Sequence, residues 1–266
     1  MWTDILADEA PEPYLARLGT IFARFDRQDS GNVSYGVALD GERLFVKTAG
    51  RPDHVPFLTH AQRVNLLHNA VRLARAYRHP ALPALRAVVD SAHGPMLVYD
   101  WADGELVGVP REHRDDPASS FQRFRGLPPD RILAALDTIV DVHDLLGRAG
   151  EIAVDFYDGC LLYDFSTHRL SLIDLDNYVP APFRNEMGRT FGSSRFMAPE
   201  EFTLGALIDQ RTSVFTLGRT ALILLGEHLR GPLHEVVTRA VRPDPAGRHG
   251  SLPEFCAAWR DARRGQ

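Results

Sequence analysis

Apolar and polar positions alternate in short runs over the first part of the chain and recur at helical spacing over most of the remainder. Between about residues 20 and 50, turn signals separate the short runs. One of them, Asp40-Gly41, lies between Val37-Ala38-Leu39 and Leu44-Phe45-Val46-Lys47. An Asp-Gly pair between alternating segments predicts a β-hairpin. This hairpin places Lys47 near the end of a strand.

One long helix and two more strands are predicted after the hairpin. Residues 60 to 77 carry apolar side chains at helical spacing, with arginines on the other faces. His79-Pro80 ends this helix, because the residue before a proline avoids the helical region. Two further strands are predicted around residues 88–89 and 96–99.

A break at Asp103-Gly104 divides the chain into a first lobe of residues 1–102 and a second lobe of residues 103–266. Residues 108–130 are polar and rich in proline, which predicts an irregular, mobile insertion. The rest of the second lobe is predicted to contain helices over residues 129–147, 214–225, 233–241 and 253–262, and short strands around residues 161–163 and 170–173. The predicted fold class is α+β, with a small β-rich lobe that has one long helix, and a mostly helical lobe.

Composition limits the classes of partner and compartment. With 266 residues and 44% hydrophobic side chains, the chain can bury a large core. A formal net charge of -5 gives no overall positive field for nucleic acid or anionic lipid, so neither is expected as a partner. Two cysteines, Cys160 and Cys256, and an acidic start without a following apolar run indicate neither a disulfide framework nor a signal peptide. We therefore expect a cytoplasmic protein.

Two further patterns exclude other site types. The most apolar stretch, residues 220–225, is too short to span a bilayer, which predicts no membrane partner. The 11 histidines show no Cys/His ligand spacing, which argues against a zinc site.

The segment Ile173-Asp174-Leu175-Asp176, followed by Met197-Ala198-Pro199-Glu200, is the most informative feature of the sequence. An acidic residue after an apolar strand, then a loop, then Ala-Pro-Glu opening a helix, is the order in which protein kinases arrange their metal-binding Asp and the end of their activation segment. Lys47 lies on a predicted strand upstream, as in that family. Over about residues 20 to 262 the chain resembles the protein kinase-like superfamily, as a divergent, bacterial-type Ser/Thr protein kinase-like protein.

The resemblance implies a bilobed kinase fold with a nucleotide site in the first lobe. Lys47 would hold the α/β phosphates of ATP. The residues implied to contact the nucleotide are Gly31, Ser34, Gly36 and Lys47, and Tyr99, Asp100, Trp101 and Ala102 of a hinge at residues 99–102. Residues 29–36 would form a Gly-rich loop whose backbone N–H groups approach phosphate. A plain hairpin turn is an equal alternative for this segment.

The resemblance also implies a catalytic loop and a metal site in the second lobe. Asp155 would accept the proton of the substrate hydroxyl, and Asp174 would bridge Mg²⁺ to the phosphates. Asp176 and Asp158 are the candidates for a second metal ligand. On an extended segment, Asp174 and Asp176 would point to the same side, because the side-chain period of a strand is two.

Several positions depart from the kinase pattern. The helix after Lys47 has no Glu, since its expected position falls at Asn69 or Ala70. In the catalytic loop, the usual His-Arg, Lys and Asn are replaced by Ala153-Val154, Tyr157 and Cys160. Without the Arg, activity is expected not to need phosphorylation of the activation loop. A thiol is a poor Mg²⁺ ligand, because Mg²⁺ prefers oxygen.

Three residues are expected to have structural roles. By the resemblance, Glu200 would form a buried ion pair with Arg248, in a segment that has the look of the family's distant Arg partner. Ser213 stands where kinases have an Asp at the start of the buried helix, and a serine there can cap the helix.

Three functions remain open from the sequence. The first is ATP- and Mg²⁺-dependent phosphoryl transfer to Ser or Thr of a protein substrate. The second is a pseudokinase that serves as a binding or scaffold module, which the missing Asn, Glu and Lys favour. The third is a small-molecule kinase, which Pro199-Glu200 disfavours, because those relatives generally lack Ala-Pro-Glu.

Overall fold

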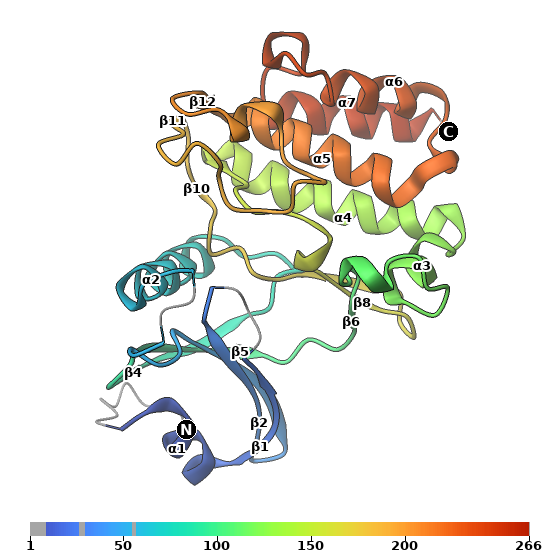
Figure 1. Cartoon of the computed structure of the whole chain (residues 1–266). Coiled ribbons are helices and arrows are strands. Elements are labelled where there is room, and N and C mark those ends of the chain that lie inside the picture. Colours follow the sequence, from blue (N-terminus) through green and yellow to red (C-terminus); the bar gives the residue numbers. More distant parts are fainter. Residues whose placement is uncertain (1–8, 27–29, 55–56, 266) are drawn as a thin grey trace. The chain divides into compact units, whose positions relative to one another are not determined.

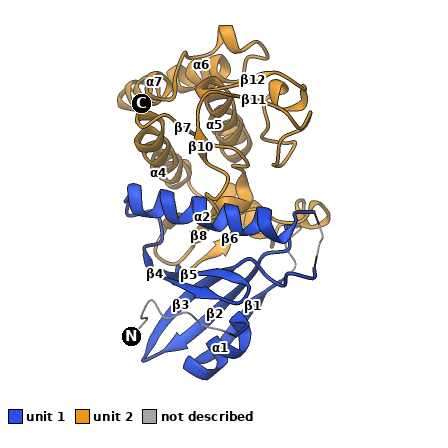
Figure 2. Ribbon diagram, turned by 90° about the vertical axis from the view of Figure 1, so that its left-hand side faces the viewer, with its two compact units in different colours: residues 1–102 blue, residues 103–266 orange. Residues whose placement is uncertain are grey.

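The computed structural model describes residues 9–26, 30–54 and 57–265. The chain divides into two compact units, residues 1–102 and 103–266 (Figure 2). Both helices and strands are present, so the predicted α+β class is confirmed. The finer expectation of a kinase fold remains a prediction.

Unit 1 contains an antiparallel sheet that, among the described residues, has five strands in the order β1-β2-β3-β5-β4. The strands are β1 (Thr20–Phe25), β2 (Val33–Leu39), β3 (Glu42–Thr48), β4 (Leu85–Ser91) and β5 (Gly94–Asp100). Asp40 and Gly41 connect β2 to β3, with left-handed φ values of 51° and 82°. This is the conformation in which a two-residue turn matches the strand twist, so the predicted hairpin is confirmed.

A helix packs on each face of this sheet (Figure 2). Helix α1 (Pro11–Leu18), which the sequence reasoning did not predict, buries Leu15 against Val37 and Val98. Helix α2 (His60–Ala76) buries apolar side chains against Leu97 on the other face. Thr59 and Gln62 form a capping box at the start of α2, and its end at Ala76 lies just before His79-Pro80, as predicted.

Unit 2 is built around four packed helices (Figure 1). They are α4 (Pro129–Arg148), α5 (Gln210–Leu225), α6 (Gly231–Ala240) and α7 (Leu252–Arg264). All four were predicted, α5 from its nearly continuous apolar run and the other three from their apolar spacing, and each buries side chains against the others. The indole N–H of Trp259 on α7 donates to the Asp137 carboxylate on α4 at 2.7 Å, which fixes the register of this pair.

Unit 2 also contains short strands. They are β6 (Glu105–Leu106), β7 (Glu151–Ile152), β8 (Leu161–Asp164), β9 (Arg169–Leu172), β10 (Val179–Pro180), β11 (Phe183–Arg184) and β12 (Leu207–Ile208). Strands β6, β8 and β9 form one sheet, and β7 pairs with β10. The two strands predicted around residues 161–163 and 170–173 form the β8–β9 hairpin, and its turn is held by Asp164, whose carboxylate accepts from Ser166 and Thr167. The strand ends opposite this turn join the segment before β8, which ends at Cys160, to the segment after β9, which begins at Ile173.

Residues 108–130 differ from the irregular insertion predicted for them. They contain a short 3-10 helix, η1 (Arg111–His113), and helix α3 (Ser120–Arg125). Phe121 and Phe124 are buried, and the Ser119 hydroxyl caps α3. The three-residue spacing of two phenylalanines was too short a pattern to stand out among the prolines.

Long apolar helices are missing from the described residues: none combines the length and hydropathy needed to cross a membrane.

Candidate functional site

Asp155 lies in the loop after β7 and has a left-handed φ of 65°. A residue other than glycine adopts this conformation where its surroundings hold it there. The Cys160 thiol donates to the Asp155 backbone carbonyl at 3.4 Å, and the Asn177 side-chain amide donates to the Asp155 carboxylate at 3.3 Å. Gly192 packs against the same carboxylate, since a Cβ on this glycine would lie 3.5 Å from Asp155 Oδ1. The loop therefore presents a half-buried carboxylate in a defined orientation.

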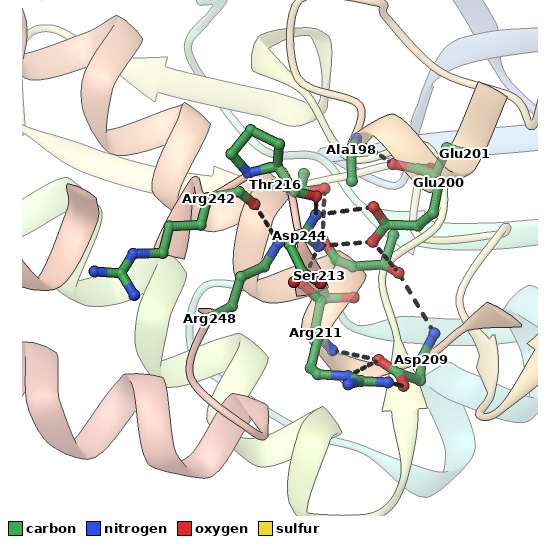
Figure 3. Close-up of polar contacts among 12 residues, drawn as sticks. Ala198, Glu200, Glu201, Asp209, Arg211, Ser213, Thr216, Arg242, Asp244 and Arg248 are labelled. Carbon is green, nitrogen blue, oxygen red and sulfur yellow. Dashed lines mark hydrogen bonds and ion pairs between the residues drawn. The ribbon is translucent and has the colours of Figure 1, made fainter. Parts of the chain in front are cut away.

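Ser213 fixes the same loop from the side of α5. Its hydroxyl accepts from the Ala153 N–H at 2.9 Å and lies 3.4 Å from the Ala153 carbonyl. The prediction that Ser213 caps α5 was wrong, because the helix begins three residues earlier. Asp209 is the cap, and its carboxylate accepts from the Arg211 N–H at 2.8 Å (Figure 3). Ser213 instead hydrogen-bonds helix α5 to Ala153, in the segment that leads to Asp155.

A buried pair, His143 and Tyr178, joins helix α4 to the loop that contains Asn177. The Tyr178 hydroxyl donates to Nε2 of His143 on α4 at 2.7 Å, and His143 Nδ1 donates to the Ile139 carbonyl at 2.7 Å. Burial lowers the pKa of His143 to about 4, so the imidazole is neutral. Because Tyr178 adjoins Asn177, this pair anchors the residue that holds the Asp155 carboxylate. The sequence reasoning placed His143 among the core positions of α4 but did not identify its partner.

Asp174 follows β9 at the open end of the β8–β9 hairpin. The Ile173 N–H donates to the Cys160 carbonyl at 2.9 Å, which extends the hairpin ladder and places Asp174 beside the Asp155–Cys160 loop. Asp174 is exposed, whereas Asp176 is only 6% exposed. The segment is not the extended one that was predicted, because Asp174 has a left-handed φ of 62°. The period-two argument for these two carboxylates therefore does not apply.

Tyr157 lies in the same loop as Asp155 and Asp158. Its pKa is raised, first by burial, and then by the negative charge of neighbouring groups, Cys160 before Asp155, Asp174 and Asp158. Asp155 and Asp158 precede the β8–β9 hairpin in the chain, and Asp174 follows it.

Asp158, a predicted metal ligand, already has a cationic partner. It begins the short helix η2 (Asp158–Cys160), is 4% exposed, and pairs with Arg195 at 2.8 Å. Burial raises the pKa of this carboxyl, and Arg195 opposes the shift. The Asp158 carboxylate is therefore already neutralised by Arg195, which weakens it as a metal candidate. Arg195 was missed because its partner lies 37 residues away in sequence.

The described residues contain no group of three or more His, Cys, Asp or Glu side chains that could hold a metal ion. Mg²⁺ does not need such a group, since it is usually held by one or two carboxylates together with phosphate oxygens and water. The exposed Asp174 carboxylate beside Asp155 fits this mode of binding. The assignment of Asp174, Asp176 and Asp158 to metal remains a prediction.

The Ala-Pro-Glu segment is anchored as expected (Figure 3). The Arg248 guanidinium donates to both oxygens of Glu200, at 2.6 and 2.9 Å, and its side chain is completely buried. Arg248 also donates to the carbonyls of Arg211, Arg242 and Pro243. Its charge and all of its N–H groups are thus satisfied, and the predicted ion pair is confirmed.

In unit 1, Lys47 lies on β3 and is only 6% exposed. Its cross-strand neighbours are Ser34 on β2 and Leu97 on β5. The Ser34 hydroxyl and the Asn32 side-chain oxygen are buried and make no hydrogen bond within the described residues. Such groups are costly to leave without partners. A buried ammonium beside an unpartnered hydroxyl fits a phosphate, to which both can donate.

The predicted Gly-rich loop joins β1 to β2, and its Asp29 lies outside the described residues. Gly31 has a left-handed φ of 85°, which suits the turn. Gly36 has a different role, since a Cβ there would lie 2.6 Å from the Phe22 ring and 2.9 Å from the Trp101 ring. Gly36 is therefore required for ring packing, which the sequence reasoning did not foresee.

Four aromatic rings gather around Gly36 on the sheet and at its edge: Phe22, Phe25, Phe45 and Trp101. The centroids of Phe22 and Trp101 are 4.9 Å apart, and those of Phe25 and Trp101 are 6.4 Å apart in a stacked arrangement. Phe22 and Phe25 are 43% and 42% exposed, so this surface remains accessible. We call these four residues the aromatic platform.

The other predicted hinge residues have structural partners within unit 1. Tyr99 is opposite Phe45 and Leu85 in the sheet and packs against the cluster under α2. Asp100 pairs with Arg86, and Ala102 is the last residue of the unit.

The predicted catalytic residues fall in separate units, with Lys47 in unit 1 and Asp155 and Asp174 in unit 2. Asp155 and Asp174 lie on either side of the β8–β9 hairpin, and the Ile173 N–H bond to the Cys160 carbonyl joins their segments. The approach of Lys47 to them is a prediction. Comparison with protein-family models and with curated proteins finds no match.

Proposed function

We propose that this chain is an ATP- and Mg²⁺-dependent phosphotransferase with a protein kinase-like fold, acting on Ser or Thr of a protein. One observation carries the proposal. Asp155 and Asp174 flank one hairpin in unit 2, and both have left-handed backbones. Backbone conformations of this kind in residues other than glycine cluster at active sites and ligand clamps.

In this proposal each residue has a defined task. Asp155 orients the acceptor hydroxyl and takes its proton, and Asn177 holds the carboxylate in position. Asp174 holds Mg²⁺, which when bound supplies charge neutralisation at the phosphates. Lys47 and the Ser34 hydroxyl donate to phosphate oxygens, and their burial strengthens these bonds.

A phosphoryl-transfer assay with radiolabelled ATP, Mg²⁺ and generic protein substrates tests the proposal. Asp155→Asn and Asp174→Asn are each expected to lower transfer by at least about a hundredfold, in keeping with the weight of acid–base groups. Asp40→Asn is the matched control, because an Asn-Gly turn supports the same hairpin. Transfer that survives both site substitutions would contradict the assignment.

Nucleotide binding can be measured separately from transfer. ATP at a hundred times its dissociation constant stabilises the folded protein by about 2.7 kcal/mol, which thermal unfolding detects. Lys47→Met is expected to abolish this shift, and Asp40→Asn to retain it. A Lys47→Met protein that still responds fully to ATP would exclude the proposed phosphate site.

A pseudokinase is the second candidate, and two observations favour it. The Cys160 thiol, at the position of the family's metal-binding Asn, is buried and bonded to the backbone of the Asp155 loop. In unit 1, the rings of Phe22 and Trp101 occupy the space beside Gly36. A stabilising shift with ATP in the absence of any transfer would support this alternative.

A further inference from the structure

An arginine cluster lies in unit 2 around the ring of Phe121 on α3. The Arg195 and Arg125 guanidinium carbons are 5.1 and 5.6 Å from the centroid of that ring. Arg114 follows η1, and its backbone carbonyl accepts from the Gln122 side chain at 2.8 Å, which ties it to α3. Burial raises the pKa of Asp158, and the positive charges of Arg195 and then Arg114 oppose the shift. Arg125 and Arg195 thus meet at the Phe121 ring, and α3 holds the segment that carries Arg114.

The cluster has more positive than negative charge. Arg195 pairs with the Asp158 carboxylate at 2.8 Å. Within the described residues, neither Arg114 nor Arg125 forms an ion pair. The Nε groups of both are buried and have no hydrogen-bond partner there. A buried donor on a charged group is costly to leave unsatisfied, so these side chains are suited to a bound anion.

Arginine is also the side chain best suited to recognise such an anion. Its planar guanidinium binds carboxylate or phosphate through two parallel hydrogen bonds. Phe121 restricts two of the guanidinium groups by cation–π contact, which reduces the ordering cost of binding.

The cluster borders the candidate catalytic loop within the same unit. Asp158 lies in the Asp155–Cys160 loop, and Arg195 follows Gly192, which packs on the Asp155 carboxylate. An anion held at this cluster would therefore lie in the same unit as Asp155, on the side of the loop where Asp158 pairs with Arg195. We propose that these arginines bind an acidic group of the protein acceptor, so that the substrates are Ser or Thr in acidic sequence. This inference rests on the proposed phosphotransferase function.

Binding of peptides tests the inference without depending on catalysis. Three fluorescent peptides share one sequence, with Ala in place of the acceptor Ser, and carry Glu, phosphoserine or Gln at the flanking positions. The Glu or phosphoserine peptide is expected to bind at least tenfold more tightly than the Gln peptide. Whichever anion binds more tightly identifies carboxylate or phosphate as the natural group. Equal binding of all three peptides overturns the proposal.

Variants assign the binding to the cluster. Arg114→Gln and Arg125→Gln are each expected to weaken binding of the acidic peptides by tenfold or more, while Arg125→Lys keeps the charge and loses only the two-pronged geometry. Arg111→Gln, at an exposed position of η1, is the matched control and should leave binding unchanged. Circular dichroism melts verify that each variant is folded. Acidic-peptide binding that is undiminished in folded Arg114→Gln and Arg125→Gln overturns the assignment.

A transfer assay with the Ser forms of the same peptides separates this inference from the proposed function. Transfer with equal efficiency to all three peptides would leave the phosphotransferase standing and remove the acidic specificity. Arginine-dependent binding of acidic peptides without any transfer would keep the anion site and remove the phosphotransferase.

Discussion

The hydroxyl of Tyr178 donates to Nε2 of His143 at 2.7 Å, joining the loop beside Asp155 to the buried helix α4. The other ring nitrogen donates to the Ile139 carbonyl one turn back along the same helix. The imidazole is therefore neutral and fully used, with one nitrogen as acceptor and the other as donor. This arrangement makes the support of the candidate site sensitive to acid.

Acid is expected to destabilise the protein through His143. Burial lowers the pKa of His143 from 6.5 to about 4, so between these values the unfolded chain binds a proton that the folded chain does not. The free energy of unfolding contributed by this group therefore falls as the pH drops from 6.5 to 4, by about 3 kcal/mol in total. Urea unfolding at a series of pH values measures the slope. The double variant His143→Leu/Tyr178→Phe removes both partners, and a slope unchanged in it would contradict the prediction.

Glu201 is expected to act in the opposite direction. Burial raises its pKa from 4.5 to about 7, although the Ala198 N–H and the Thr190 hydroxyl donate to it. Between these values the folded protein holds a proton that the unfolded chain has lost, so stability falls as the pH rises from 4.5 to 7. The total is about 3 kcal/mol.

Glu201→Gln tests this assignment, because the amide has the same shape and cannot ionise. Its oxygen can accept from the Ala198 N–H, and its NH2 can donate to the Thr190 hydroxyl. The variant should match the parent protein in urea unfolding at pH 5 and exceed it at pH 8. Glu112→Gln on the exposed helix η1 is the control and should follow the parent curve throughout. Parallel curves for Glu201→Gln and the parent would show that Glu201 is ionised over the whole range.

The Glu200–Arg248 pair predicts a large loss of stability from a single substitution. Arg248→Met leaves a nearly buried carboxylate without its cation and is expected to cost about 3–5 kcal/mol in urea unfolding. The exposed pair of Arg51 and Asp53 provides the contrast, and Arg51→Met should cause no measurable change. Replacing Glu200 and Arg248 together by apolar residues should recover part of the loss. A single-variant loss as small as that of Arg51→Met would refute the structural role.

Gly36→Ala is expected to disturb the aromatic platform. The new methyl group would lie within 3 Å of the rings of Phe22 and Trp101, so at least one ring must move. The expected cost is about 1–3 kcal/mol, as for other overpacked positions. A change in tryptophan fluorescence in the folded protein would report the displaced Trp101 ring. Gly41→Ala, where a Cβ would meet no atom within 4 Å, separates steric crowding from backbone conformation.

Sequence patterns were sufficient where local chemistry determines the structure. The Asp40-Gly41 turn and helices α2, α4, α5, α6 and α7 follow from turn residues and apolar spacing, which act over a few neighbouring positions. Helix α3 was missed because one turn of apolar spacing is short and lies among prolines. Helix α1 was likewise not predicted.

The candidate site was accessible to sequence reasoning only in part. Asp155, Asp174 and the Glu200–Arg248 pair followed from motifs. The Asp158–Arg195 pair, the bond from Ser213 to Ala153 and the packing of Trp101 on Gly36 depend on tertiary contacts between distant residues. Nor could the left-handed backbones of Asp155 and Asp174 be read from spacing, because they arise from the loops that hold them.

Those two backbones determine how the site should be probed. Alanine at either position would remove a carboxylate, and it would also destabilise the loop because alanine rarely adopts a left-handed backbone. A loss of activity in an Ala variant could therefore have either cause. Asparagine is nearly isosteric with aspartate and enters the left-handed region several times more readily than most residues. A comparison of the Asn and Ala variants would therefore separate the chemistry of the carboxylate from the mechanical task of holding its loop.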